Sequence, residues 1–141
     1  DELTKCGNRL ALNWAFGGKF DVSQSMGVIM CDLNGLKKRN DSYGHEAGDQ
    51  YLSDATDVLK HAFSKENIYR IGGDEFVVVL LGWDEQQICE SIRRVKSDAQ
   101  EREVSFSVGY AFRDKAADSF DDLLREADQW MYKDKRKYYE S

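Results

Sequence analysis

Two acidic residues stand at the tip of a predicted β-hairpin near the middle of the chain. Asp74 and Glu75 follow Gly72 and Gly73, and runs rich in β-branched and aromatic residues flank these four positions. Two glycines between such runs predict a hairpin with a tight turn, because glycine adopts positive φ at no steric cost. A turn needs no acids beyond solubility. The pair is therefore either a solvated hairpin tip or a place where a divalent metal can bind.

A third acid, Asp32, favours the metal-binding alternative. It lies near the end of residues 26–33 (MGVIMCDL), a nearly continuous apolar run that predicts a strand covered on both faces. A carboxylate at the end of a buried strand is costly unless a cation or hydrogen-bond donors meet it. Magnesium prefers oxygen ligands and commonly shares one or two carboxylates with substrate phosphates. Asp32, Asp74 and the backbone carbonyl next to Asp32 therefore predict a Mg²⁺ site suited to nucleotide chemistry.

The sequence also offers groups that can meet phosphates. Two metal ions about 3.5–4 Å apart can activate an attacking hydroxyl while they hold the phosphates that it attacks. Gly72 and Gly73 have no side chains, so a phosphate or ribose can approach their backbone closely. Lys37 and Lys135 are candidates to neutralise a triphosphate, although either can equally be a surface lysine. The spacing of these residues names neither the base nor the reaction.

Composition narrows the class of protein. At 141 residues the chain fits one domain, and its 41% hydrophobic and 33% charged residues are typical of a soluble globular protein. Cys6, Cys31 and Cys89 are odd in number and lack C-x-x-C spacing, which argues against a disulfide framework or a zinc site and for a reducing compartment. The formal net charge of −6 argues against a nucleic-acid backbone as the main partner. A nucleotide stays compatible with that charge if a metal supplies positive charge.

The first residue is Asp1, so we expect residues 1–141 to be one domain at the C-terminal part of a longer protein. No apolar run is long enough to span a bilayer, and no apolar leader follows a basic start. The expected location is cytoplasmic, with an upstream region that can hold a sensor or a membrane anchor.

Periodicity predicts one sheet with helices packed against it. Strands are expected at 26–33, in the hairpin over 68–81 and at 104–112. Helices are expected at 1–16, 43–63, 83–100 and 120–138, with a short helical turn and a loop over 34–42. This order predicts an α/β fold with a single mixed, mainly antiparallel sheet flanked by helices, of the ferredoxin-like kind. Right-handed crossovers would then put Asp32 and Asp74 at the same edge of the sheet.

Helical spacing also predicts which side chains of the terminal helices face the core. The first helix is expected to start at a cap on Asp1 or Thr4, to end at Gly17-Gly18 before a loop over 20–25, and to bury Leu3, Leu10, Leu12 and Trp14. The last helix is expected to bury Leu123, Leu124, Ala127, Trp130 and Met131. In the strand at 104–112, bulky residues alternate with Ser, Gly and Ala, which predicts one bulky and one thin face.

Five sequence blocks resemble, in order and near the usual spacing, the GGDEF family of diguanylate cyclases. They are Asp1-x-Leu3-Thr4-x-x-x-Asn8-Arg9, Cys31-Asp32-Leu33-Asn34-Gly35-Leu36-Lys37-x-x-Asn40-Asp41-x-Tyr43-Gly44-His45-x-x-Gly48-Asp49, Gly72-Gly73-Asp74-Glu75-Phe76, Ser107-Val108-Gly109-Tyr110-Ala111, and Ala127-Asp128-x-x-Met131-Tyr132-x-x-Lys135. The match runs almost end to end, and five ordered blocks are far more specific than the five-letter signature alone. The resemblance implies a fold related to the palm domain of nucleotide cyclases and polymerases.

The resemblance also implies a reaction, in which two GTP molecules become cyclic dimeric GMP and two pyrophosphates. It implies dependence on Mg²⁺, with Mn²⁺ as an alternative. Each domain of a dimer would bind one GTP, and the active site would form only when two half-sites face each other. The implied partners are therefore GTP, a second copy of the domain and an upstream dimerisation or sensor domain.

Roles for individual residues follow from the same resemblance. Asp32, the carbonyl of Leu33 and Asp74 would hold the metal. Asp74 would also help to deprotonate the 3′-hydroxyl, beside Glu75 at the tip. The phosphates would meet Lys37, counted with the catalytic groups, and the substrate-binding set would be Leu36, Asn40, His45, Asp49, Gly72, Gly73 and Lys135.

Asn40 and Asp49 would read the guanine edge under this assignment. A carboxylate accepts hydrogen bonds from N1 and the exocyclic amino group of guanine, and adenine lacks both donors. The alternative for Asp49 is an ordinary exposed helix residue. His45 would lie between them at the pocket rim, and its alternative is also an exposed surface residue.

The chain departs from the family pattern near the site. The loop after the first acid reads Asn34-Gly35-Leu36, where many members carry an acid and aromatic residues, so we expect a looser pocket floor. Tyr139 stands where an arginine commonly follows the lysine of the last helix. One phosphate contact would then be lost, or be taken by Arg136 or Lys137.

A third departure concerns product inhibition. The inhibition site of the family is an Arg-x-x-Asp pair shortly before the signature, and here Phe63 and Glu66 occupy those positions. We therefore expect no feedback inhibition through that site.

Three functions are compatible with these residues. The first is an active cyclase half-site that becomes productive on dimerisation. The second is a catalytically weak domain that binds GTP as a regulatory or interaction module, supported by the altered loop and by Tyr139. The third, a ferredoxin-like RNA-binding domain, is opposed by the acidic balance and by the lack of exposed aromatic pairs on a strand.

Overall fold

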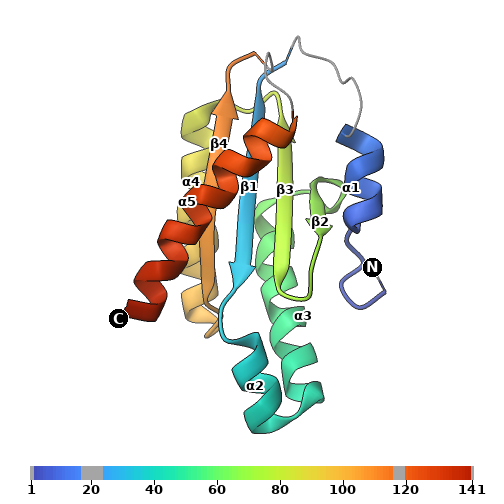
Figure 1. Ribbon diagram of the computed structural model, residues 1–141, viewed down its shortest axis with the longest axis vertical. Helices are drawn as coiled ribbons and strands as arrows, with labels where there is room; N and C mark the ends of the chain where they lie inside the picture. The colour runs from blue at the N-terminus through green and yellow to red at the C-terminus, as the bar shows by residue number, and fades with distance from the viewer. Residues whose placement is uncertain (1, 17–23, 116–119, 141) are drawn as a thin grey trace.

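The computed structural model describes residues 2–16, 24–115 and 120–140 (Figure 1). In chain order the elements are α1 (Arg9–Phe16), β1 (Met26–Leu33), α2 (Leu36–Tyr43), α3 (His45–Ala62), a 3₁₀ turn η1 (Lys65–Asn67), β2 (Ile68–Arg70), β3 (Glu75–Leu81), α4 (Glu85–Glu101), β4 (Phe106–Arg113) and α5 (Phe120–Glu140). None of the helices in the described part of the chain is long and apolar enough to cross a membrane.

The four strands form one sheet in the order β2-β3-β1-β4, and every pair of neighbouring strands is antiparallel. This arrangement confirms the predicted α/β fold with a single sheet flanked by helices. The one parallel element in the described residues is an isolated bridge between Gly7, which lies outside the named strands, and Tyr69 of β2.

Helices cover both faces of the sheet. The core residues of α3 and α4 pack against one face, and those of α1 and α5 pack against the other. Figure 1 shows α5 crossing in front of β4 and β1, with α3 and α4 behind the sheet and α2 beyond its end. All eight residues of β1 are buried, as its unbroken apolar run predicts for a central strand.

The predicted thin face of β4 allows α5 to lie directly on the sheet. A Cβ atom added to Gly109 would lie 2.0 Å from the backbone nitrogen of Met131 and 2.4 Å from the carbonyl oxygen of Ala127. The bulky residues Val108 and Phe106 pack on the opposite face with α3 and α4. The end of α5 is thereby held close to the end of β1.

The predicted helix over 1–16 is wrong in its first half. The helix begins at Arg9, and the side chain of Asn8 accepts a hydrogen bond from the backbone nitrogen of Ala11 at 2.8 Å. Residues before it are held by β2 instead, because Gly7 exchanges backbone hydrogen bonds with that strand. The predicted cap Thr4 is buried, and Asp1, Gly17-Gly18 and most of the loop over 20–25 lie outside the described residues.

Three other predictions are corrected by the structure. Of the expected stripe on the first helix only Leu12 is buried, whereas Leu3, Leu10 and Trp14 are exposed. On the last helix the predicted core residue Trp130 is 53% exposed, with the ammonium of Lys133 4.3 Å from its ring centroid. The segment over 34–42 contains a two-turn helix, α2, and not merely a helical turn and a loop.

The hairpin is present, but its turn differs from the prediction. Neither Gly72 nor Gly73 has positive φ. The hairpin closes through a hydrogen bond from the backbone nitrogen of Ile71 to the carbonyl oxygen of Glu75 at 2.9 Å. Three residues lie between these two positions, so the tip is longer than the two-residue turn for which positive φ is required.

Candidate active site

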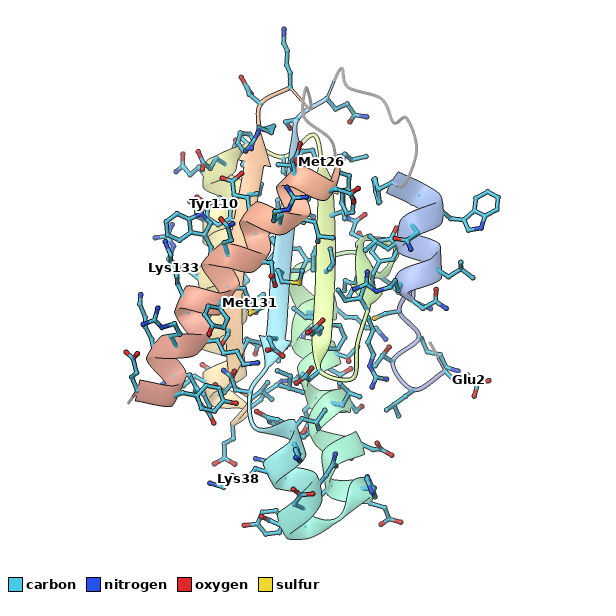
Figure 2. The ribbon with its side chains drawn as sticks, in the orientation of Figure 1. Glu2, Met26, Lys38, Tyr110, Met131 and Lys133 are labelled. Carbon is cyan, nitrogen blue, oxygen red and sulfur yellow. The ribbon has the colours of Figure 1, made fainter. Side chains whose placement is uncertain are left out.

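Strand pairing brings Asp32 and Asp74 to one edge of the sheet. In the β1–β3 ladder Asp32 lies opposite Glu75, and the backbone nitrogen of Leu33 donates to the carbonyl oxygen of Asp74 at 2.7 Å. This edge lies next to α2, and Figure 2 shows Lys38 of α2 beyond it, at the opposite end of the molecule from Met26, where β1 begins. The expected juxtaposition of the two acids is therefore present.

Asp32 is a buried acid with one oxygen paired and one unpaired. Its side chain is 3% exposed, and its Oδ2 accepts a hydrogen bond from the ammonium of Lys135 on α5. Its Oδ1 is buried and has no hydrogen-bond partner among the described residues. Burial raises the pKa of Asp32 above its ordinary value; Lys135 opposes this increase, and the nearby Asp74 adds to it. A buried acceptor of this kind is well suited to a further cation.

Lys135 covers the acid from the side of α5. Its hydrogen bond to Asp32 raises the pKa of Lys135, and the charges of Asp32 and Asp74 add to the increase. The pKa values of both members of this pair are raised, although an ion pair by itself would lower that of the acid. For Asp32 the cost of burial therefore outweighs the attraction of the lysine.

Glu75 adds further negative charge on the same face of the sheet. Burial raises its pKa, and the carboxylates of Asp32, Asp74 and Asp128 raise it further, while Arg9 lowers it. Like charges gathered at one edge repel each other, so a bound cation would be stabilised there.

A groove of about 660 Å³ opens beside these acids, between the end of β1, α2 and the last turns of α5. Five of the predicted residues line it: Leu33, Leu36, Lys37, Asp74 and Lys135. A larger cavity of about 870 Å³ lies along β4 between α4 and α5, and of the residues named as candidates for the site only Lys137 lines it. We place the site in the smaller groove, because Asp74 lines it together with Lys135, the partner of Asp32.

Asn40, Asp49 and His45 lie on the α2–α3 helical hairpin and do not line this groove. Gly44 joins the helices with φ of 92°. A Cβ atom on Gly48 would lie 1.5 Å from Oδ1 of Asn40, so the side chain of Asn40 rests against the start of α3. Asp49 is the next residue of α3, and both it and His45 are exposed. The hairpin thus carries Asn40 and Asp49 on adjacent helices.

Gly72 and Gly73 form the tip of the β2–β3 hairpin, next to Asp74. A Cβ atom added to Gly73 would have no atom of the described chain within 4 Å, so its backbone is open to approach. A Cβ on Gly72 would lie 3.3 Å from a carboxylate oxygen of Glu75.

Asn34 supports the end of β1 beside the site, a structural role that its position in the sequence does not predict. It is 3% exposed; its amide nitrogen donates to Oγ of Ser105 at 3.0 Å, and its Oδ1 accepts from Oγ of Ser107 at 2.9 Å. Its carbonyl oxygen accepts from the hydroxyl of Tyr51 at 2.7 Å. These bonds tie the end of β1 to β4 and α3. Asn34, the first residue of the loop at which a looser pocket floor is expected, is therefore held on three sides.

Neither of the two candidates to replace the missing arginine lines the groove, although Lys38 does. Tyr139 lines it together with Tyr138, and their rings meet edge to face with centroids 5.0 Å apart. Among the residues described, neither Arg136 nor Lys137 lines this groove: Arg136 lies 3.8 Å from Glu140, and Lys137 lines the larger cavity.

The two positions of the family's product-inhibition pair, Phe63 and Glu66, also differ from the family pattern. Phe63 is 4% exposed and packs near Trp83, with ring centroids 6.1 Å apart. Glu66 is exposed on the 3₁₀ turn. Neither side chain offers the cation that an anionic product would require at the first position.

The residues at the edge fit a magnesium ion that completes its coordination with other ligands. Within the described ranges no group of three or more His, Cys, Asp or Glu side chains could by itself hold a metal. Asp32, Asp74 and the carbonyl of Leu33 supply hard oxygen donors, and the unpaired Oδ1 of Asp32 lacks only a cation. Such a partial set is usual for Mg²⁺, which takes its remaining ligands from water and substrate phosphates.

Comparison with known proteins gives a consistent result. Residues 1–140 match the family model described as diguanylate cyclase, GGDEF domain. The chain is 32% identical over 145 residues to the diguanylate cyclase DgcS of Shewanella oneidensis, and the match covers 96% of this chain and 49% of DgcS. It is 28% identical over 152 residues to the diguanylate cyclase DosC of Escherichia coli K12, covering 97% of this chain and 33% of DosC. The chain therefore spans half or less of the length of these relatives.

The fold is also similar to that of a solved structure. The GGDEF domain of DgcB from Caulobacter crescentus, crystallised in complex with c-di-GMP, superimposes with a TM-score of 0.84 at 22% identity, covering 97% of this chain and 90% of that chain. This likeness supports the fold alone. From the match over nearly its whole length, the chain belongs to the GGDEF family of diguanylate cyclase domains.

Proposed function

We propose that this domain condenses two molecules of GTP into cyclic dimeric GMP and two pyrophosphates, as a dimer of half-sites. The observation that carries the proposal is the meeting of Asp32 and Asp74 at one sheet edge, beside a groove lined by Lys37 and Lys135. Membership of the family, and its relatives among diguanylate cyclases, support the same reaction.

The reaction needs a nucleophile from one nucleotide and a phosphorus atom from the other. The 3′-oxygen of one GTP forms a bond to the α-phosphorus of the second, and the bond from that phosphorus to the oxygen of the leaving pyrophosphate breaks. Asp74 accepts the proton of the 3′-hydroxyl. A second, reciprocal attack closes the ring, so two half-sites must face each other.

The acids and lysines at the edge have complementary tasks. Asp32, Asp74 and the carbonyl of Leu33 would hold Mg²⁺ or Mn²⁺, which would supply positive charge to the triphosphate and favour ionisation of the attacking hydroxyl. Lys37 and Lys135 neutralise phosphate charge from the walls of the groove. The backbone of Gly72 and Gly73 leaves room for the phosphates or the ribose at the tip.

The α2–α3 hairpin selects the base in this proposal. Asp49 accepts from N1 and the exocyclic amino group of guanine, and Asn40 contacts the same edge. His45, exposed at the start of α3, lies at the rim. Packing of Asn40 on Gly48 supports the proposal, because it holds the amide beside the residue that precedes Asp49 in the chain.

One observation favours a second function, a catalytically weak GTP-binding module. Tyr139 lines the groove where the family commonly has an arginine, and a phenol brings no positive charge to a phosphate. Binding of GTP without turnover would be the result.

Turnover of GTP separates the two functions. The full-length protein, or this chain fused to a dimeric coiled coil, is incubated with GTP and Mg²⁺, and pyrophosphate and cyclic dinucleotide are measured. We expect both products to be lost in Asp74→Asn and retained in Asp57→Asn, which changes an exposed acid of α3. Nucleotide binding without either product in the wild-type protein would instead support the binding module.

A further inference from the structure

The segment before α1 pairs through its backbone with β2, the outer strand of the β2–β3 hairpin. The backbone nitrogen of Gly7 donates to the carbonyl oxygen of Ile68 at 3.1 Å, and that of Arg70 donates to the carbonyl oxygen of Gly7 at 2.7 Å. The ring of Tyr69 lies against Gly7, where an added Cβ would come within 2.6 Å of it. The ammonium of Lys60 on α3 donates to the carbonyl oxygen of Thr4 at 2.7 Å. The segment is thus fixed to both β2 and α3.

This contact leaves the backbone of Arg70 held on two sides. One side bonds to Gly7, and on the other Arg70 lies opposite Phe76 in the β2–β3 ladder. The Cα atom of Arg70, from which its side chain extends, is therefore held in place. Its Nη2 donates to the carbonyl oxygen of Gly73 at 2.9 Å, across the tip of the hairpin.

The hydrogen bonds at the tip fix the two peptide planes on either side of Asp74. The carbonyl of Gly73 belongs to the plane before the Cα atom of Asp74, and Arg70 holds it. The carbonyl of Asp74 belongs to the plane after it, and the backbone nitrogen of Leu33 holds that one at 2.7 Å. Two fixed planes determine φ and ψ of the residue between them. The direction of the Cα–Cβ bond of Asp74, from which its carboxylate extends, then follows from the geometry at Cα.

We propose that Arg70 is a positioning residue for Asp74, which it orients through the carbonyl of Gly73. The inference rests on the proposed cyclase function for its kinetic consequence, while its structural content concerns the hairpin alone. The glycines at the tip make such a restraint necessary, because Gly72 and Gly73 have no side chains to pack and glycine has the widest choice of backbone conformation. An acid that must meet both a metal and a hydroxyl tolerates little displacement.

The test removes the guanidinium while it keeps an unbranched apolar side chain at the position. Arg70→Met removes the donor, Arg70→Lys keeps a donor that can reach the same carbonyl, and Arg125→Met is the matched control on the exposed surface of α5. Each variant is made in the dimerised form used for the turnover assay, and urea unfolding is recorded to compare folding. We expect Arg70→Met to lower kcat by about 10- to 100-fold with KM for GTP nearly unchanged. We expect Arg70→Lys to recover most of this loss.

Amide hydrogen exchange at Gly73, Asp74 and Glu75, measured by NMR, gives a second readout that needs no turnover. Exchange at these amides should become faster in Arg70→Met and stay as in the wild type in Arg125→Met. Unchanged exchange in Arg70→Met would overturn the proposal. A loss of activity that comes from a higher KM for GTP would also overturn it, because it would indicate that Arg70 contacts the substrate directly. If the wild-type protein makes no product, the cyclase function fails, and the exchange rates still decide whether Arg70 restrains the tip.

Discussion

Replacement of Asp32 by asparagine should separate the stability of the domain from its proposed activity. The two side chains have the same shape, but the amide cannot ionise. Asp32 is buried, one of its oxygens is paired with Lys135, and the other has no partner within the described chain. Asparagine can accept from Lys135 with its oxygen and donate to Asp74 with its nitrogen. The substitution therefore removes a buried charge and satisfies the orphaned position.

The pKa of Asp32 determines how the effect depends on pH. Burial raises this pKa above the unfolded value of 3.8, so the folded chain binds the proton more tightly than the unfolded chain does. The stabilisation that this proton brings is fully present below 3.8 and is lost as the pH rises through the folded pKa. Above the folded pKa the wild-type protein has lost this stabilisation, whereas asparagine resembles the protonated acid at every pH.

The expected change in stability in Asp32→Asn follows from the one hydrogen bond that the substitution adds and from the exposure of Lys135. A hydrogen bond contributes about 1 kcal/mol net, and Lys135 stays partly solvated when it loses its counterion because its side chain is 31% exposed. We expect the free energy of unfolding to rise by about 1 kcal/mol near pH 7, which corresponds to about 3 °C in Tm. The difference from the wild type should shrink as the pH falls below the folded pKa of Asp32.

Urea unfolding followed by circular dichroism at several pH values measures the stability, and the GTP turnover assay measures the activity. Asp57→Asn serves as the control, since this exposed acid lies 3.9 Å from Arg102 in a surface pair of little energetic weight. Turnover should be lost in Asp32→Asn and kept in the control. Destabilisation by about 2 kcal/mol or more near pH 7 would refute the reasoning, because it would mean that the charged form of Asp32 supports the fold.

Three further predictions follow from the packing. Gly48→Ala should displace Asn40, whose Oδ1 would lie 1.5 Å from the new Cβ, so KM for GTP should rise and discrimination against ATP should fall in a competition assay. Gly109→Ala should lower the free energy of unfolding by about 3 kcal/mol or more, since its Cβ would lie 2.0 Å from the backbone of α5; urea unfolding measures this. Titration of cyclic dimeric GMP should show no micromolar binding at Phe63 and Glu66, and binding abolished by Glu66→Ala would contradict that expectation.

The central strand and its acid could be predicted because both depend on local sequence. An apolar run of eight residues is a strong signal for a buried strand, and Asp32 is the charged residue within it. The pairing of Asp32 with the hairpin then follows from the few connections that a sheet of this order permits. The predicted bounds of β1 match the observed ones for the same reason.

The N-terminal segment could not be predicted in the same way, because distant residues determine its structure. The predicted stripe fits a helix, but Leu3, Leu10 and Trp14 are exposed and Leu12 is the one member of the stripe that is buried. The backbone of Gly7 pairs with β2, more than 60 residues away in the sequence. Pairing of this kind leaves no periodic signal near the segment itself. The same holds for Asn34, which contacts Ser107 on a strand 73 residues away.

The buried polar network at Asn34 explains how the edge can tolerate its excess of negative charge. Asp32, Asp74 and Glu75 repel one another, so the end of β1 needs support that does not depend on them. Asn34 lies two residues after Asp32 and gives this support through neutral hydrogen bonds to β4 and α3. An acid at this position would add a further charge to the cluster. Asn34→Asp should therefore lower the free energy of unfolding. This loss of stability should become smaller as the pH falls and the added carboxyl takes up its proton. A loss of stability that does not depend on pH would indicate that hydrogen-bond geometry, and not charge, makes the amide necessary.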